Sequence, residues 1–109
     1  MSTPTAPEPP QMGEITDAGG LEGTVRMRYW ASVRAAQGRA EEQVAVPRDG
    51  ASVAWLLGQI TADRDPRVAQ VVAVCSVLVD ELVVHAGQAE ETLVRPGSVV
   101  DLLPPFAGG

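Results

Sequence analysis

The sequence predicts an α+β fold in which one main helix lies across one face of a mixed sheet. Three observations predict it: apolar and polar residues alternate in two early segments, one later segment repeats apolar residues at helical spacing, and short apolar runs follow that segment. Runs of strands on both sides of one helix are typical of α+β domains. At 109 residues the chain fits one domain with one hydrophobic core.

The first part of the chain is predicted to form a strand, a short helix and a second strand. Residues 25–31 alternate, which places every second side chain on one face of a strand. Residues 31–38 contain good helix formers and end in Gly38, as a short helical turn would. Residues 42–46 alternate again before the chain breaks at Pro47, and we expect the two strands to pair as a hairpin.

The main helix is predicted to begin after Ser52, whose side chain suits an N-cap. Its apolar residues fall at the spacing of one buried face, and they are Val53, Leu56, Leu57 and Ile60. Trp55 stands beside that face, and we expect it to be a packing residue, because no basic groove accompanies it for nucleic-acid bases. A second helical piece is expected at residues 66–73.

The last part of the chain is predicted to contain three short strands. Residues 76–79 and 82–84 are apolar runs separated by Asp80 and Glu81, which predicts two strands joined by a tight polar turn. Residues 99–103 form the final apolar run and should be a buried strand.

The chain divides into three parts. Residues 1–23 are rich in proline and contain no apolar run, so we expect a disordered N-terminal extension. Residues 24–105 should form the folded domain. Residues 106–109 should form a flexible C-terminal tail that ends in Gly-Gly.

Charge and composition argue against several kinds of partner. The formal net charge is -6, so a phosphate backbone would repel the chain, and nucleic acid is not an expected partner. No segment is apolar over the roughly 20 residues that a membrane span needs, so no membrane association is expected. Cys75 is the only cysteine and cannot form an intramolecular disulfide, which favours a cytoplasmic location.

The segment LLPPFAGG, residues 102–109, has the features of a reactive tail. Pro104 and Pro105 lack the N–H group that a sheet ladder needs, so they end the strand and direct the chain away from it. Without a Cβ, Gly108 and Gly109 allow an enzyme to approach the backbone closely. The ionised carboxylate of Gly109 can attack the α-phosphate of ATP without a general base.

The chain resembles the ubiquitin-like β-grasp sulfur carriers of the MoaD/ThiS type, most closely those that form the small subunit of molybdopterin synthase. The resemblance covers nearly all of residues 25–109 and therefore implies a ubiquitin-like β-grasp fold. Its most specific parts are the segments VRMRYWASVRAAQG, SVAWLLGQI and PGSVVDLLPPFAGG. Members of the family commonly end in a Pro-Pro-x-x-Gly-Gly pattern, matched here by Pro104, Pro105, Gly108 and Gly109.

The resemblance also implies a reaction sequence and its partners. An adenylating (E1-like) enzyme would activate Gly109 with ATP and magnesium. A sulfur donor, such as a persulfide or a rhodanese-type protein, would then convert the acyl-adenylate into a thiocarboxylate. The tail would insert into the large subunit of molybdopterin synthase and supply sulfur to cyclic pyranopterin monophosphate during molybdenum cofactor biosynthesis. The chain itself would hold no permanent cofactor and no metal, and catalytic side chains would belong to the partner.

The same resemblance assigns roles to the C-terminal residues. Gly109 would be the reacting residue, adenylated first and then thiocarboxylated. The residues inserted into the partner would be Pro104, Pro105, Phe106, Ala107 and Gly108. Leu102 and Leu103, which stand where many relatives carry aromatic residues, would contact the surface of the partner.

Two other functions stay open at this point. One is a carrier with the same chemistry that feeds cysteine or thiamine biosynthesis. The other is a ubiquitin-like protein modifier, or a binding module whose tail forms no covalent bond.

Other reactive residues form no convincing site in the sequence. His85 is the only histidine, and no metal ligands stand near it at the required spacing. Cys75 borders an apolar strand, where a free thiol behaves as a small hydrophobe. Within the pairs Glu41-Glu42 and Glu90-Glu91, adjacent side chains do not share a strand face, so we expect solvated carboxylates rather than an acid/base pair.

Overall fold

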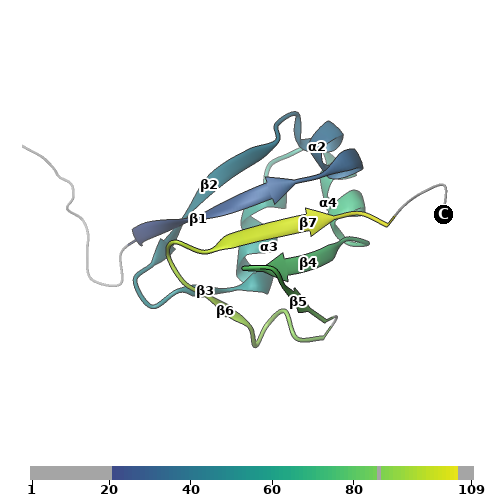
Figure 1. Cartoon of the computed structure of the whole chain (residues 1–109). Helices are drawn as coiled ribbons and strands as arrows, with labels where there is room; N and C mark the ends of the chain where they lie inside the picture. Colours follow the sequence, from purple (N-terminus) through teal and green to yellow (C-terminus); the bar gives the residue numbers. More distant parts are fainter. Residues whose placement is uncertain (1–20, 86, 106–109) are drawn as a thin grey trace, which may run out of the picture.

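A computed structural model, which describes residues 21–85 and 87–105, shows a five-stranded mixed sheet with helices on one face (Figure 1). In spatial order the strands are β2 (Glu41–Pro47), β1 (Leu21–Tyr29), β7 (Val99–Leu103), β4 (Ser76–Val79) and β5 (Leu82–Val84). The helices are α2 (Ala31–Gln37), α3 (Val53–Thr61) and α4 (Pro66–Val72). A separate two-stranded sheet pairs β3 (Ala51–Ser52) with β6 (Leu93–Val94).

The sheet is mixed because its two central strands run in the same direction. β1 and β7 pair in parallel, with Met27 opposite Val100, whereas every other neighbouring pair in this sheet is antiparallel. β1 and β2 form the predicted hairpin, and α2 fills the connection between them. The predicted α+β architecture, with a mixed sheet and one main helix across it, is therefore confirmed.

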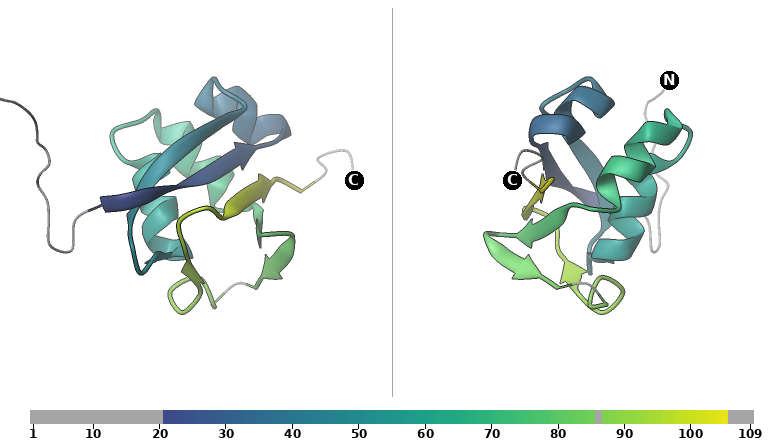
Figure 2. Two further views of the ribbon diagram at one scale, coloured as in Figure 1. Left: turned by 60° about the vertical axis from the view of Figure 1, so that its left-hand side comes forward. Right: turned by 90° about the vertical axis from the view of Figure 1, so that its right-hand side faces the viewer.

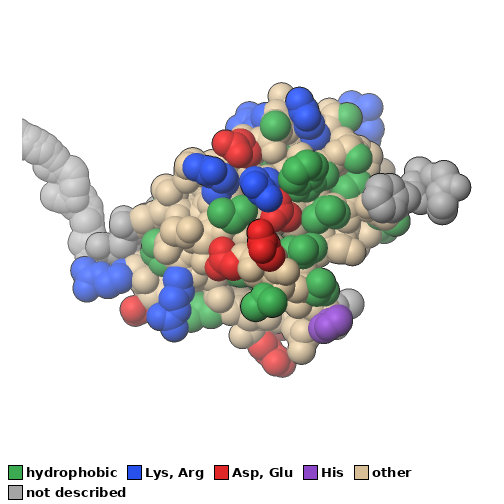
Figure 3. Space-filling view, viewed as in Figure 1, with side chains coloured by type: hydrophobic (Ala, Val, Ile, Leu, Met, Phe, Trp, Pro, Cys, Tyr) green, Lys and Arg blue, Asp and Glu red, His purple; other side chains and the backbone are tan. Residues whose placement is uncertain are grey.

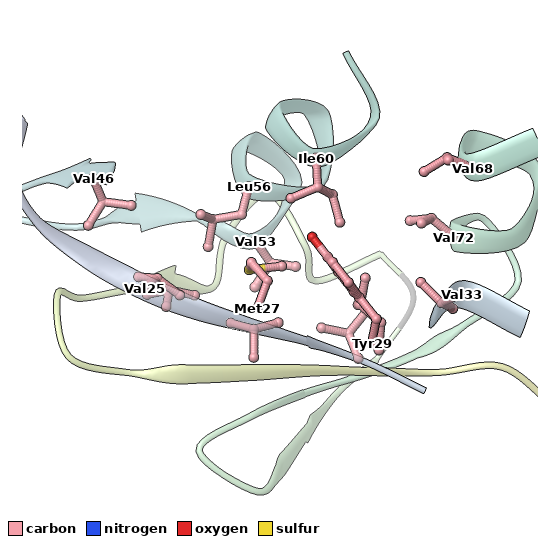
Figure 4. Packing of buried hydrophobic residues seen from close by; sticks show 14 residues of the cluster. Val25, Met27, Tyr29, Val33, Val46, Val53, Leu56, Ile60, Val68 and Val72 are labelled. Carbon is pink, nitrogen blue, oxygen red and sulfur yellow. The ribbon is translucent and has the colours of Figure 1, made fainter. Parts of the chain in front are cut away.

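The core lies between the sheet and the helices α3 and α4 (Figure 2). Alternate residues of β1 point toward the helices, so Val25, Met27 and Tyr29 are buried. In α3 the residues Val53, Leu56 and Ile60 are fully buried, as the helical spacing predicts, and Figure 4 shows them facing the β1 side chains. Because these helices cover only one face, the other face of the sheet is open.

Local sequence signals determine where several helices and strands begin or end. The hydroxyl of Ser52 accepts a hydrogen bond from the backbone N–H of Trp55 at 3.0 Å, which caps α3 as predicted. Gly38 ends α2 with φ of 75°, a left-handed conformation that glycine adopts without steric cost. Asp80 and Glu81 both have positive φ in the turn between β4 and β5, as expected for a two-residue hairpin turn.

The structure corrects both predicted ends of the first strand. β1 begins at Leu21, which pairs with Pro47 of β2, so the strand starts inside the segment assigned to a disordered extension of residues 1–23. The strand ends at Tyr29, and Ala31 begins α2 instead of continuing the alternation. The disorder expected for residues 1–20 stays a prediction, because these residues lie outside the described part.

The predicted packing role of Trp55 is also wrong. We expected it to pack, but its side chain is 39% exposed and it is not part of the hydrophobic core. Helical spacing places Trp55 beside the buried stripe of α3, and among the described residues that flank stays partly open to solvent. The short pair β3 and β6 was not predicted at all.

The prediction that the Glu42 carboxylate is solvated is also wrong, because this carboxylate forms an ion pair. Its side chain is 12% exposed and accepts hydrogen bonds from Arg64 at 2.6 and 3.1 Å and from the hydroxyl of Tyr29. Arg64 also donates to the side chain of Gln37 at 2.9 Å. The network thus ties β1, β2 and α2 to the connection between α3 and α4.

The network lowers the pKa of Glu42. Burial alone would raise this pKa, but hydrogen bonds from Arg64 and Tyr29, together with the charges of Arg64 and Arg39, outweigh the burial. The folded-state pKa is then lower than the unfolded-state pKa. The stabilisation is fully present above the unfolded-state pKa of Glu42 and is lost as pH falls through the folded-state pKa.

Replacing Glu42 with Gln should therefore lower the free energy of unfolding by about 2 kcal/mol at neutral pH, because the hydrogen bonds from Arg64, Arg39 and Tyr29 lose their charged acceptor. Urea unfolding of Glu42→Gln and the wild type, measured between neutral and acidic pH, checks this. Glu41→Gln, at the exposed neighbouring position, is the control and should change stability by less than about 0.5 kcal/mol. A difference between E42Q and wild type that stays constant on acidification would contradict the assignment.

Candidate functional site

The C-terminal segment leaves the domain from the centre of the sheet. β7 pairs with β1 on one side and with β4 on the other, so the strand that precedes the tail is held along both edges. The strand ends at Leu103, immediately before the two prolines, as predicted. Pro104 is half-buried and Pro105 is exposed. The pairing of β7 with two strands therefore fixes the start of this segment at one end of the molecule (Figure 1).

The remaining tail residues lie outside the described residues. Phe106, Ala107, Gly108 and Gly109 were assigned to insertion and reaction, and these assignments stay predictions. The proposed insertion of Pro104 and Pro105 also stays a prediction.

The structure corrects the role of Leu102. This residue was expected to contact a partner, but its side chain is 0% exposed and packs in the core with Val100 and Tyr29. Alternation along β7 explains the difference, because Leu102 points toward the helices while Leu103 points to the open face. Leu103 is partly exposed and stays a candidate for partner contact.

A buried carboxylate occupies the open face of the sheet. Asp101, in the middle of β7, is 6% exposed and accepts hydrogen bonds from Nε of Arg28 at 2.6 Å and from Nη2 of Arg28 at 3.3 Å. The indole N–H of Trp30 donates to the same carboxylate at 3.0 Å. The guanidinium of Arg28 lies over the Trp30 ring, 5.6 Å from its centroid.

These contacts keep Asp101 ionised. Burial opposes the charge and would raise the pKa of Asp101, but the hydrogen bonds from Arg28 and Trp30 and the charge of Arg28 lower it overall. The carboxylate in turn fixes two side chains that reach the surface. Arg28, Trp30 and Asp101 form one cluster beside the root of the tail.

A small polar cleft adjoins this cluster. It has a volume of about 250 Å³ and is lined by Arg28, Asp80, Glu81, Val99 and Asp101. The turn residue Asp80 holds the start of β7, since its carboxylate accepts the Val99 N–H at 2.9 Å and its own N–H donates to the Val99 carbonyl at 2.8 Å. The cleft is therefore lined both by the turn after β4 and by β7, the strand that precedes the tail.

The cluster was missed in the sequence, although a signal for it was present. Asp101 interrupts the apolar run VVDLL, and a carboxylate in a buried strand requires a hydrogen-bonding partner. Arg28 stands on the outward face of the alternating first strand. Their pairing could not be found because 73 residues separate them along the chain.

The other reactive residues are placed apart from this cluster. Cys75 is half-buried, its thiol donates to the carbonyl of Val71, and burial raises the pKa of the thiol to about 11. His85 follows β5 and is exposed. Cys75 and His85 both line a pocket of about 400 Å³ on the helix side of the sheet.

Within residues 21–85 and 87–105, no group of three or more possible metal ligands occurs. In this part, no helix is long and apolar enough to cross a membrane.

Comparisons with solved structures establish the fold. The HVO 2177 protein of Haloferax volcanii matches with a TM-score of 0.68 and 21% identity, over 93% of this chain and 100% of that chain. The small archaeal modifier protein 1 of Methanosarcina acetivorans matches with a TM-score of 0.65 and 20% identity, over 83% of this chain and 100% of that chain. At these identities the likeness shows a shared ubiquitin-like β-grasp fold.

A third structure belongs to a protein assigned as molybdopterin converting factor subunit 1 from Pyrococcus furiosus. It matches with a TM-score of 0.59 and 21% identity, over 78% of this chain and 100% of that chain. A search of curated proteins found no significant match.

The family model of the ThiS family matches residues 27–109, which is more than half of the chain. The match begins within β1 and includes β7, both prolines and the terminal Gly-Gly. It therefore covers the elements that position the tail as well as the tail sequence itself. The chain belongs to the ThiS family of ubiquitin-like sulfur carriers.

Proposed function

We propose that the protein is the small, sulfur-carrying subunit of a molybdopterin synthase and that the C-terminal carboxylate of Gly109 carries the sulfur. One observation carries the proposal: the match to the sulfur-carrier family runs through Pro104-Pro105 to Gly108-Gly109. The likeness of the fold to molybdopterin converting factor subunit 1 supports the choice of pathway.

In the proposed chemistry the carboxylate is activated before it accepts sulfur. An oxygen of the Gly109 carboxylate attacks the α-phosphate of ATP, which releases pyrophosphate and leaves an acyl-adenylate. ATP and magnesium are used by the adenylating enzyme and are not held by this chain. The terminal sulfur of a persulfide then displaces AMP, and a thiol cleaves the resulting acyl disulfide to release the thiocarboxylate.

In this proposal the chain positions the reacting tail and supplies no catalytic side chain. β7 is fixed on both edges, and the prolines after Leu103 restrict the direction in which the next residues leave the sheet. Gly108 and Gly109 offer a narrow backbone that a partner can surround. Sulfur delivery to the pterin substrate would take place in the large synthase subunit after insertion of this tail.

The proposal predicts a thiocarboxylate at Gly109 in protein purified from its own cells. Trypsin cuts after Arg67 but resists the Arg95–Pro96 bond, so the C-terminal peptide is 68–109 and contains none of the three methionines, whose oxidation could imitate the mass change. Tandem mass spectrometry should find one oxygen replaced by sulfur in fragments that contain Gly109 but lack Cys75. The reference is a synthetic peptide of residues 68–109 that ends in the free carboxylate.

The same measurement separates the alternatives. The carrier chemistry would be contradicted if Gly109 were found only as the free acid, even after incubation with ATP, a sulfur donor and cell extract. All eight basic residues of the chain are arginine, so a lysine-linked adduct of the tail would join it to a different protein and indicate a modifier. A thiocarboxylate with binding to a cysteine-synthase-like enzyme, but not to a pterin synthase subunit, would indicate the other sulfur pathway.

A further inference from the structure

Trp30 follows the last residue of β1 and stands beside the end of β7. We propose that Trp30 is a positioning residue: its hydrogen bond to Asp101 fixes the direction in which the two prolines leave the sheet. A fixed direction raises the fraction of carrier molecules whose tail can enter the site of the adenylating enzyme. The inference rests on the proposed function, because it concerns the delivery of Gly109 to that enzyme.

The end of β7 is held differently along its two edges. On one edge the pairing with β4 extends to Leu103, which is opposite Ser76. On the other edge the pairing with β1 stops at Leu102, opposite Tyr29, because the chain then turns into α2. Trp30 is the next residue, and Figure 1 shows that β1 and β7 end on the same side of the molecule. A contact from Trp30 can therefore replace the pairing that β1 does not supply.

The side chain of Trp30 supplies this contact. Its indole N–H donates to the Asp101 carboxylate at 3.0 Å, and Asp101 precedes Leu103 on the same face of β7. The acceptor is itself fixed, because Arg28 donates to this carboxylate at 2.6 and 3.3 Å and Asp101 is 6% exposed. Figure 3 shows this open face of the sheet, where acidic and basic side chains lie next to hydrophobic ones. A network of several hydrogen bonds to a buried group rigidifies the elements that it joins.

The local structure at Trp30 departs from what helix formation alone favours. As the N-cap of α2, Trp30 makes no side-chain hydrogen bond to the helix, whereas Ser, Thr, Asp or Asn would do so at this position. Ala31, the next residue, has φ of 48°, a left-handed conformation that costs free energy in a residue other than glycine. Such departures persist where the surrounding structure stabilises them, and they gather at functional sites. Here the stabilising contact is the bond between Trp30 and Asp101.

The two prolines carry the direction of β7 away from the sheet. A residue before proline is restricted to extended conformations, so Leu103 and Pro104 are both restricted in ψ. The proline ring fixes φ, so Pro104 and Pro105 add no free rotation about that angle. These three consecutive residues therefore form a stiff segment of roughly 9 Å. A change in the orientation of Leu103 is transmitted through this segment to the residues that follow it.

The first test measures ATP–pyrophosphate exchange with the purified adenylating enzyme from the same cells. Trp30→Phe keeps an aromatic ring but removes the indole N–H. It should raise the KM for the carrier about fivefold and leave kcat within about twofold, because fewer free molecules have a correctly directed tail. Trp55→Phe makes the same change at a position that is 39% exposed on α3, and it should alter neither constant. Circular dichroism should show both variants folded.

A double-mutant cycle separates positioning from direct contact with the enzyme. Replacing both Pro104 and Pro105 with alanine removes the stiff segment, so Trp30 no longer determines the direction of the tail in that background. Adding W30F to this proline variant should therefore raise KM by less than about twofold. A further rise of about fivefold in that background would mean that Trp30 acts by contacting the enzyme, and it would overturn the inference.

Backbone dynamics give a readout that does not depend on the enzyme. In the wild type, ¹⁵N relaxation should give the Leu103 amide the order parameter of rigid backbone, about 0.85. W30F should lower this order parameter and W55F should leave it unchanged. Equal order parameters in W30F and the wild type would overturn the inference even if the wild type forms the adenylate. A lower value in W30F, together with no pyrophosphate exchange by the wild type, would instead refute the carrier chemistry and leave the role of Trp30 in directing the tail standing.

Discussion

Deletion of Gly109 is expected to abolish thiocarboxylate formation while leaving the stability of the domain unchanged. The reacting carboxylate would then belong to Gly108 and would stop about 3.5 Å short of its position in the wild type. In acyl and phosphoryl transfer, a misplacement of about 1 Å can already cost about 100-fold in rate. The core residues described in the structure lie between Val25 and Leu102, so the deletion changes none of them.

The measurement combines ATP–pyrophosphate exchange with intact-mass analysis after incubation with the adenylating enzyme and a sulfur donor. A chain with one alanine appended after Gly109 keeps every native residue but displaces the carboxylate in the opposite direction, and it should be equally inactive. Urea unfolding should give the same free energy for both variants and the wild type. Sulfur transfer at the wild-type rate by either variant would mean that Gly109 is not the reacting residue.

Replacement of Leu102 with Asp is expected to unfold the domain. The side chain of Leu102 is fully buried in the core, and an unpaired carboxylate there would cost several kcal/mol in addition to the lost packing. Domains of this size have total stabilities of about 5–15 kcal/mol, so one such substitution removes most or all of it. Circular dichroism and thermal unfolding would show the loss directly.

Leu103→Asp is the matched control for this effect. It introduces the same group one residue further along β7, on the partly exposed opposite face. We expect L103D to fold with a stability loss of less than about 1.5 kcal/mol and to bind the adenylating enzyme more weakly than the wild type. Similar stability losses in the two variants would contradict the opposite orientations of these leucines.

The sequence predicted those elements whose signal is local. Residues 76–79 and 82–84 were recognised as strands because apolar runs flank a polar two-residue turn, and Ser52 was recognised because capping depends on adjacent residues. β3 and β6 contain two residues each and pair across about forty intervening residues. No local pattern can indicate such a pairing.

Periodicity indicates the faces of an element but does not show what covers each face. Leu102 was assigned to partner contact through the resemblance to the family, which says nothing of the face of the sheet to which its side chain points. Glu42 was expected to be solvated, yet Arg64 reaches it from the connection between two helices. Trp30 and Asp101 became candidates only when the sheet brought β1 beside β7.

The central position of β7 also has a consequence for the order of events during synthesis. Its neighbours β1 and β4 are made earlier on the ribosome, so each waits with an unpaired inner edge until the last strand emerges. An incomplete chain therefore exposes two strand edges and is open to proteolysis and aggregation. Completion of the sheet by β7 is therefore also the step that fixes the position and direction of the two prolines before the tail.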